Sequence, residues 1–202
     1  MASRTEFILE RDSFMRPYTS VVAEYCMPFS CCDKDLDDFF SHDAFLYDSE
    51  LLGKTYAWID ASDPTKIIGL VTLANDSIKA HFLASSARNR LQRSITNAKR
   101  GMSYPAVLIG RLGVSSEYRG KGYNIGTQII DFLKGWFRTS DNKTGCRFFV
   151  VDAYNNDATL HFYEKNGFKL LYKTEDEERD FLHLTHDDAL ETRFMFFDLK
   201  HI

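Results

Sequence analysis

The stretch from Leu108 to Gly126 constrains the fold of this chain most. In it an apolar run is followed by a basic, glycine-rich loop and then by a second set of regularly spaced apolar residues. The loop contains two basic residues and two glycines: Arg119, Lys121, Gly120 and Gly122. Apolar residues then recur at helical spacing, which predicts a helix that begins near Ile125. Glycine backbone approaches a ligand closely, and a helix N-terminus offers unpaired N–H donors. The pattern predicts a phosphate site, with a tight turn carrying two solvated basic residues as the alternative.

This loop resembles the pyrophosphate loop of the GNAT superfamily of N-acetyltransferases, whose pattern is Arg/Gln-x-x-Gly-x-Gly/Ala. Arg119 and Gly122 match its first two fixed positions. An ungapped match puts Asn124 at the third position, where asparagine is tolerable because it visits left-handed backbone conformations readily. The other register inserts Tyr123 and Asn124 and makes Gly126 the last glycine. We favour the insertion, because it aligns the apolar residues that follow with the helix of the family.

A second motif follows the apolar run 148–151, which we expect to be a buried strand. In the superfamily such a strand ends in an Asn, a short helix follows, and its tyrosine precedes a Gly-Phe corner. Asn156, Tyr163 and the pair Gly167-Phe168 match that order. Together the two motifs imply an α/β (mixed α+β) GNAT fold. Such a fold has a central, mostly antiparallel mixed sheet, splayed at the acetyl-CoA site, with helices on both faces.

The resemblance implies an acyltransferase that uses acetyl-CoA as co-substrate. Gly110 and Gly113 interrupt an apolar strand, which indicates a bulge or a close approach, so that the pantetheine arm can pair with the adjacent backbone. The implied cofactor-binding residues are Leu112, Gly113, Val114, Arg119, Gly120, Lys121, Gly122, Asn124, Ile125, Gly126 and Asn156. Tyr163 is the candidate catalytic acid that protonates the departing thiolate, since a tyrosine, with a pKa of about 10, carries its proton at neutral pH. The alternative for Tyr163 is an aromatic side chain packed between helix and sheet.

The front half of the chain is similar to the GNAT-type toxins of bacterial toxin–antitoxin pairs, in segments such as Phe29-Ser-Cys31, Lys54-Thr55-Tyr56 and Gly110-Arg111-Leu112. Those enzymes acetylate the α-amine of aminoacyl-tRNA. The chain departs from them at Cys32, where they usually have glycine, and in its acidic region near the C-terminus.

In the apolar strand that precedes the basic loop, residues 111–114 include no carboxylate. This part of the strand therefore offers no general base. An α-amine has a pKa of about 8, against about 10.4 for lysine, and needs little help to lose its proton near neutral pH. This favours an α-amine acceptor. Asp76, Asp152 and His161 stay open as bases that act through water.

The segment from Ser77 to Ser116 contains no acidic residue, although neighbouring segments are acidic. Its candidate tRNA-binding residues are Arg88, Arg90, Arg93, Lys99 and Arg100. Such a segment suits an RNA backbone, because phosphate contacts supply most of the affinity that is independent of sequence. A solvated helix face that complements the protein's own acidic segments is the alternative.

Other patterns predict the remaining elements. We expect a short strand at 6–9, a helix at 36–47, a hairpin of strands 55–60 and 67–73, a helix or helical pair within 81–101, a charged loop at 175–188 and a final strand at 192–199. His183 and His186 lie beside carboxylates in that loop, but no cysteine pair completes a metal site, so we expect no metal.

The 202 residues suit one domain, residues 1–202. A net charge of −4 argues against a general polyanion binder. No run of 18 apolar residues exists, and the charged start is unlike a signal peptide, so we expect no membrane partner. Four cysteines, three of them clustered, do not form a secreted disulfide framework, which favours the reducing cytoplasm and unreactive thiols.

Three readings of the function follow. The first is acetylation of a primary amine by direct attack on acetyl-CoA, in its toxin-like form on aminoacyl-tRNA. The second is acetylation of a small-molecule amine or a protein N-terminus. The third is a coenzyme-A-binding module in which the loop insertion has removed turnover. A homodimer is compatible with each.

Overall fold

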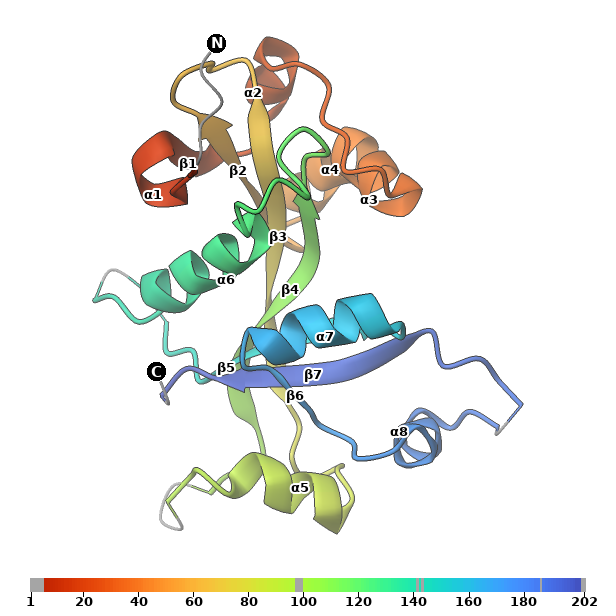
Figure 1. Cartoon of the computed structure of the whole chain (residues 1–202). Helices are drawn as coiled ribbons and strands as arrows, with labels where there is room; N and C mark the ends of the chain where they lie inside the picture. The colour runs from red at the N-terminus through yellow and green to blue at the C-terminus, as the bar shows by residue number, and fades with distance from the viewer. Residues whose placement is uncertain (1–5, 97–99, 141, 143, 186, 201–202) are drawn as a thin grey trace. The chain divides into compact units, whose positions relative to one another are not determined.

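The computed structural model describes residues 6–96, 100–140, 142, 144–185 and 187–200 (Figure 1). Within them, seven strands are hydrogen-bonded in the order β1-β2-β3-β4-β5-β7-β6. The chain forms two compact units, Met1–Ala74 with Ile109–Trp136 and Asn75–Leu108 with Phe137–Ile202. Strands β3 (Ile67–Ile78) and β4 (Tyr104–Val114) contribute residues to both units. The predicted mixed, mostly antiparallel sheet is confirmed.

The first unit contains the predicted hairpin. Strand β2 (Lys54–Asp60) pairs antiparallel with β3, from Lys54 opposite Leu73 to Ile59 opposite Ile67. On its other side β2 pairs antiparallel with β1 (Ser13–Pro17). Alternate β2 side chains therefore point to opposite faces of the sheet.

The strand expected at residues 6–9 is wrong. The first strand is β1, and a short helix, α1 (Leu9–Asp12), precedes it. Side chains satisfy the backbone here: Asp12 accepts from the Ile8 amide at 2.9 Å, and Gln128 accepts from the Leu9 amide at 2.7 Å. The apolar segment therefore has no need of a neighbouring strand to pair these amides.

Helices cover both faces of the first unit's sheet. On one face, α2 (Ser20–Tyr25), α3 (Lys34–Asp38) and α4 (Ala44–Ser49) join a core that includes Ala57 and Ile59. On the other, α6 (Ile125–Trp136) lies beside β2 and β3 (Figure 1), with Phe132 against Trp58. The predicted helix at 36–47 is confirmed as part of a continuous helical segment, 34–49, that includes a π-helical turn at Phe39–Asp43.

The second unit continues the sheet with a parallel pair. Strand β5 (Phe148–Tyr154) pairs parallel with β4 over Ala106–Leu108 and antiparallel with the whole of β7 (Thr192–Asp198). The short edge strand β6 (Lys169–Leu170) pairs antiparallel with β7. The final strand and the apolar strand at 148–151 are thus confirmed.

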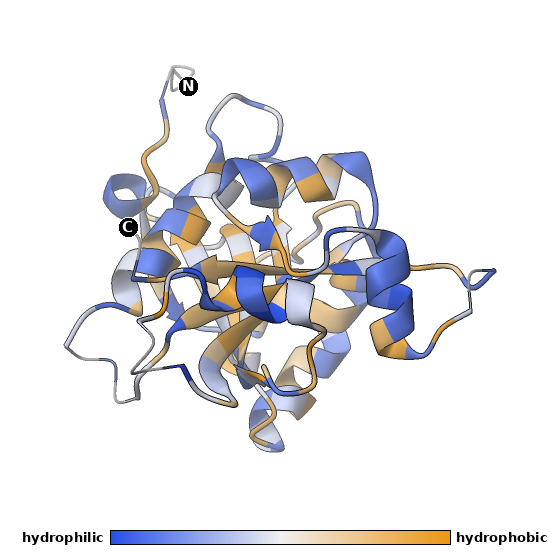
Figure 2. Ribbon diagram, turned by 90° about the horizontal axis from the view of Figure 1, so that it is seen from below, coloured by the Kyte–Doolittle hydropathy of each residue, from blue (hydrophilic) through white to orange (hydrophobic). Residues whose placement is uncertain are grey.

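Helices α5 (Ser85–Gln92) and α7 (Asp157–Lys165) pack on opposite faces of this part of the sheet. Helix α5 shares a core with Phe148 and Val150, whereas Tyr163 of α7 reaches the β7 ring Phe197 through Phe168. In Figure 2 the strands are mostly hydrophobic and the helices carry both colours, as expected for helices with one buried face. The helix expected within 81–101 is shorter than predicted, and residues 97–99 lie outside the described residues.

The loop expected at 175–188 is wrong over its first half, which forms α8 (Glu175–Leu182). The hydroxyl of Thr174 caps this helix by accepting from the Glu177 amide at 3.2 Å. Four acidic residues occupy the first turn, where the helix dipole favours negative charge. The high charge of the segment therefore supports a helix. No described helix is long and apolar enough to cross a membrane.

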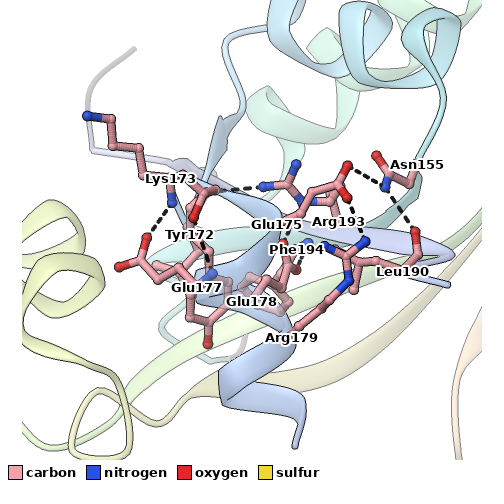
Figure 3. A network of polar contacts seen from close by, with 12 residues as sticks. Asn155, Tyr172, Lys173, Glu175, Glu177, Glu178, Arg179, Leu190, Arg193 and Phe194 are labelled. Atoms are coloured by element: carbon pink, nitrogen blue, oxygen red, sulfur yellow. Dashed lines mark hydrogen bonds and ion pairs between the residues drawn. The ribbon is translucent and has the colours of Figure 1, made fainter. Parts of the chain in front are cut away.

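A buried ion pair joins α8 to β7 (Figure 3). Glu178 is 2% exposed and Arg193 is 6% exposed. The Glu178 carboxylate accepts from Arg193 Nε and from the Phe194 amide, each at 2.6 Å. Arg193 also donates to the Tyr172 carbonyl at 3.3 Å. Since both charges are shielded from water, each depends on the other.

We predict that Glu178→Ala lowers the free energy of unfolding by about 3–5 kcal/mol, because it leaves the Arg193 guanidinium buried without its acid. Urea unfolding followed by circular dichroism measures the change. The control is Asp38→Ala, which breaks an exposed pair with Lys34 and costs less than about 1 kcal/mol. Equal losses in the two variants would contradict the role of the buried pair.

Candidate functional site

The basic loop has three left-handed positions in alternation. Gly120 has φ 75°, Gly122 has φ 78° and Asn124 has φ 52°. Successive N–H groups in such an alternating backbone turn toward one side and form a concave anion site. Asn124 therefore has the left-handed conformation that an asparagine at the third fixed position of the family pattern was expected to adopt. Both registers of the family pattern remain predictions.

The loop leaves its amides available to a ligand. Among the described residues, no backbone carbonyl accepts a hydrogen bond from the amides of Gly120, Lys121 or Gly122. A Cβ added at either glycine would meet nothing within 4 Å, so the space beside this backbone is open. Helix α6 starts directly after the loop at Ile125, and its first-turn amides lack helical partners. The loop therefore has the features of a phosphate-binding site.

Contacts beneath the loop hold its ends in place. Gln128 Nε2 donates to the Tyr123 carbonyl at 2.7 Å and to the Phe7 carbonyl at 2.9 Å. Before the loop, the Tyr118 hydroxyl donates to the buried Asp60 carboxylate at 2.6 Å. Burial, followed by the hydrogen bond to Asp60 and its negative charge, raises the pKa of Tyr118. Sequence reasoning missed these supporting residues, because their partners are far away in sequence.

Helix α6 approaches the sheet closely at Gly69, where an added Cβ would lie 2.8 Å from Ile129 Cδ1. On β4, a Cβ at Gly113 would lie 3.0 Å from the Phe40 ring and 3.2 Å from the Phe29 ring. The close approach expected at Gly113 is therefore made by aromatic side chains. Leu112 and Val114 flank it in the same strand. The pairing of this backbone with a pantetheine arm stays a prediction.

Arg111 precedes these strand residues and lies over an aromatic ring. Its guanidinium carbon is 5.0 Å from the centre of the Phe39 ring, and Nη1 donates to the Gly110 carbonyl at 2.8 Å. Asp35 lies 4.0 Å from Nε. These contacts fix a positive charge beside the strand.

Asn156 and Tyr163 belong to the second unit. The Asn156 side chain accepts from the Thr159 amide at 2.9 Å and so caps α7. Tyr163 is 7% exposed and packs edge-on against Phe162 and Phe168, with ring centres 5.1 and 5.2 Å away. Burial raises the pKa of Tyr163 above its ordinary value. The hydroxyl therefore keeps its proton at neutral pH, which suits an acid.

The candidate bases differ in their surroundings. Loss of hydration, with the negative charge of Asp76, raises the pKa of Asp152 above its ordinary range. A raised pKa makes the carboxylate a better proton acceptor. His161 is exposed on α7. Of the three candidate bases, Asp152 is therefore the best suited to accept a proton.

The structure separates the predicted tRNA-binding residues. Arg88 is turned inward, since it donates to the carbonyls of Ala80 at 3.1 Å and Leu83 at 2.8 Å. Arg93 and Arg100 are exposed, and Lys99 lies outside the described residues. Arg90 donates to the Leu171 carbonyl. The exposed basic surface is thus narrower than the sequence predicted.

The cysteines are free thiols: Cys26, Cys31, Cys32 and Cys146. Burial raises the pKa of Cys31 to about 12, helped by a hydrogen bond to Asp37, and that of Cys146 to about 11. These thiols therefore stay protonated and unreactive at neutral pH. Within the described part of the chain no three metal-binding side chains gather into a site, and His186 lies outside it.

Comparison with known proteins shows that one protein-family model matches this chain. A model described as an acetyltransferase (GNAT) domain matches residues 56–170. No curated protein matches the chain by sequence.

Similar solved structures extend the comparison over nearly the whole chain. A mutant of KacT is 16% identical, with 94% of this chain and 96% of that chain covered and a TM-score of 0.62. AtaT complexed with acetyl-methionyl-tRNAfMet is 17% identical, with 94% and 96% covered and a TM-score of 0.63. A mutant AtaT toxin bound to acetyl-CoA and the C-terminus of the antitoxin AtaR is 16% identical, with 94% of each chain covered and a TM-score of 0.59. At these identities the likeness shows a shared fold.

We predict that Arg119→Ala weakens acetyl-CoA binding about 10- to 100-fold, because a charge-assisted hydrogen bond contributes about 1.5–3 kcal/mol. Isothermal titration calorimetry measures the affinity. Arg138→Ala removes the same charge from an exposed site outside the loop and is the control. Unchanged affinity in Arg119→Ala would refute the phosphate role of the loop.

Proposed function

Since the chain belongs to the GNAT acetyltransferase family, we propose that it transfers an acetyl group from acetyl-CoA to the α-amine of an aminoacyl-tRNA. The observation that carries the proposal is the loop of three left-handed residues, with available amides and open space, that leads directly into α6. This backbone suits the pyrophosphate of acetyl-CoA, with Arg119 and Lys121 adding positive charge.

The chemistry needs few groups from the protein. Acetyl-CoA supplies an activated thioester, and the amine attacks its carbonyl carbon directly. The new C–N bond forms, the C–S bond breaks, and coenzyme A leaves as a thiolate. Holding both reactants in the correct orientation accounts for much of the acceleration.

Tyr163 supplies the proton for the departing thiolate. Its buried hydroxyl is neutral over the physiological pH range, because burial raises its pKa. The proton transfer is coupled to the breaking of the C–S bond, so that the hydroxyl neutralises the negative charge that develops on sulfur. The rigid packing of its ring against Phe162 and Phe168 limits the positions of the hydroxyl.

We infer the acceptor from the pKa of its amine. An α-amine with a pKa of about 8 is partly neutral at pH 7 to 8, so a strong base is unnecessary. Asp152, whose pKa is raised, takes the amine's proton through water. An aminoacyl-tRNA presents such an amine, and it also presents phosphates to the exposed Arg93 and Arg100. AtaT, with a similar fold, has been observed with acetyl-methionyl-tRNAfMet.

We predict that Tyr163→Phe lowers kcat by about 100-fold or more, because the general acid is lost. The ring remains, so the fold and the acetyl-CoA affinity should be retained. Steady-state kinetics and calorimetry measure the two quantities. Wild-type turnover in the variant would remove Tyr163 from the mechanism.

The acceptor is tested by transfer of radiolabelled acetyl from acetyl-CoA to charged total tRNA and, in parallel, to free amino acids, polyamines and peptides with free N-termini. We expect label on the charged tRNA and loss of that label when the aminoacyl ester is hydrolysed beforehand. Label on free amines alone would assign a small-molecule or N-terminal acetyltransferase. Binding of acetyl-CoA with no transfer to any amine would leave a coenzyme-A-binding module.

A further inference from the structure

Arg111 carries a positive charge that the proposed acetyl transfer does not use. It lies in β4 directly before residues 112–114, the backbone that we expect to pair with the pantetheine arm. Side chains two residues apart in a strand share a face, so Arg111 lies on the face of Gly113, against which the Phe40 ring packs. These residues all belong to the first unit. The charge therefore lies next to the strand at which we expect the thioester.

An aromatic ring supports the guanidinium. The guanidinium carbon of Arg111 lies 5.0 Å from the centre of the Phe39 ring, a cation–π contact. Phe39 is 6% exposed and packs edge-on against Phe40 and Tyr47, with ring centres 5.6 and 5.4 Å away. It begins the π-helical turn, in which the Ala44 amide donates to the Phe39 carbonyl. Such turns are frequent at functional sites, and this one holds the ring on which Arg111 rests.

The guanidinium retains donors for a ligand. Of its five N–H donors, one is engaged within the described part of the chain, by the bond from Nη1 to the Gly110 carbonyl at 2.8 Å. Nε is buried and has no hydrogen-bond partner among the described residues. The Asp35 carboxylate, 4.0 Å from Nε, is beyond hydrogen-bond distance. Because the side chain is 40% exposed, a ligand can reach it.

Asp35 is the acid that competes with a ligand for this charge. Its side chain is 64% exposed, and an exposed pair of this kind is weak because water screens it. The other acids of this helical segment have contacts of their own: Asp33 accepts from the Leu36 amide, Asp37 accepts from the Ser30 hydroxyl and the Cys31 amide, and Asp38 pairs with Lys34. An anion that accepts two hydrogen bonds from the guanidinium can therefore replace the contact with Asp35.

The shape of the guanidinium limits the ligands that fit. Its planar fork donates parallel hydrogen bonds to a carboxylate or a phosphate. The proposed acceptor holds its amino acid as an ester, so it has no free α-carboxylate. Its nearest anion is the phosphate one nucleoside away from that ester. Since the amine has to reach the thioester beside β4, this phosphate comes close to the same strand.

We propose that Arg111 binds the phosphate of the 3′-terminal nucleotide of the aminoacyl-tRNA and thereby positions the α-amine at the thioester. The inference rests on the proposed aminoacyl-tRNA acceptor. It assigns to the first unit a contact separate from those of Arg93 and Arg100, which belong to the second. Its effect is orientation of the acceptor for direct attack.

The test measures, by calorimetry, the binding of 3′-alanylamino-3′-deoxyadenosine with and without a 5′-phosphate. This amide analogue keeps the α-amine and does not lose its amino acid by hydrolysis. Coenzyme A at saturation occupies the cofactor site, so that no acetyl transfer takes place. We expect the phosphate to strengthen binding to the wild type by at least about 10-fold, as for a charge-assisted hydrogen bond.

The variants act on this phosphate gain in opposite directions. Arg111→Ala should reduce it to less than about twofold, and Arg111→Lys should restore only part of it, because a lysine lacks the fork. Asp35→Asn should increase it about two- to fivefold, since the competing charge is removed. A merely structural role of Arg111 would not produce this increase.

The matched control is Arg16→Ala, which should keep the wild-type phosphate gain. Arg16 is exposed in the same unit, and its guanidinium carbon also lies over an aromatic ring, 5.2 Å from the centre of Phe14. Retained coenzyme A affinity and thermal melting show that each variant folds.

An unchanged phosphate gain in Arg111→Ala would overturn the proposal, and so would a wild type that binds both analogues equally. Binding of free alanine that is lost in Arg111→Ala, without any phosphate gain, would overturn it in favour of a carboxylate ligand. Acetyl transfer to charged tRNA is measured separately. Its absence in the wild type would refute the proposed function, whereas the phosphate gain decides the role of Arg111 in either case.

Discussion

The backbone between β4 and α6 has to reverse from an extended strand into a helix, and it does so through left-handed positions at Gly120, Gly122 and Asn124. This constraint determines much of the first unit. Helix α6 must start where the loop ends, and it reaches the sheet because Gly69 has no side chain beneath Ile129. Gln128 then ties the loop and the N-terminal segment to the same helix. In the same turn, no backbone hydrogen bond to another described residue is donated by the amides of Gly120, Lys121 or Gly122.

The two units divide the proposed chemistry. The loop proposed to bind phosphate belongs to the first, and Tyr163 and Asp152 belong to the second. The pKa of both groups is raised, with different consequences. A raised pKa keeps the tyrosine protonated as an acid, whereas it makes the carboxylate more basic. The ion pair between Glu178 and Arg193 fastens α8 to the strand that also pairs with β5, which carries Asp152.

Sequence patterns predicted the local elements well where periodicity and turn chemistry agree. The amphipathic helix after the loop begins at Ile125 as expected, and the hairpin of β2 and β3 follows its turn signal. Most failures involve contacts that are distant in sequence, although the helix at 175–182 also has local signals, the Thr174 cap and the acidic first turn. The Leu9 amide donates to the distant Gln128, and in the acidic helix 175–182 the buried Glu178 pairs with Arg193. The inward orientation of Arg88 likewise depends on partners that spacing does not reveal.

The central claim is that the loop recognises the pyrophosphate of acetyl-CoA through its backbone. The most direct measurement compares, by calorimetry, the affinities of the protein for acetyl-CoA and for S-acetylpantetheine, which has the same thioester and pantetheine arm but no pyrophosphate. The account predicts that acetyl-CoA binds at least about 100-fold more tightly, since several charge-assisted hydrogen bonds are added. Equal affinities for the two compounds would contradict it.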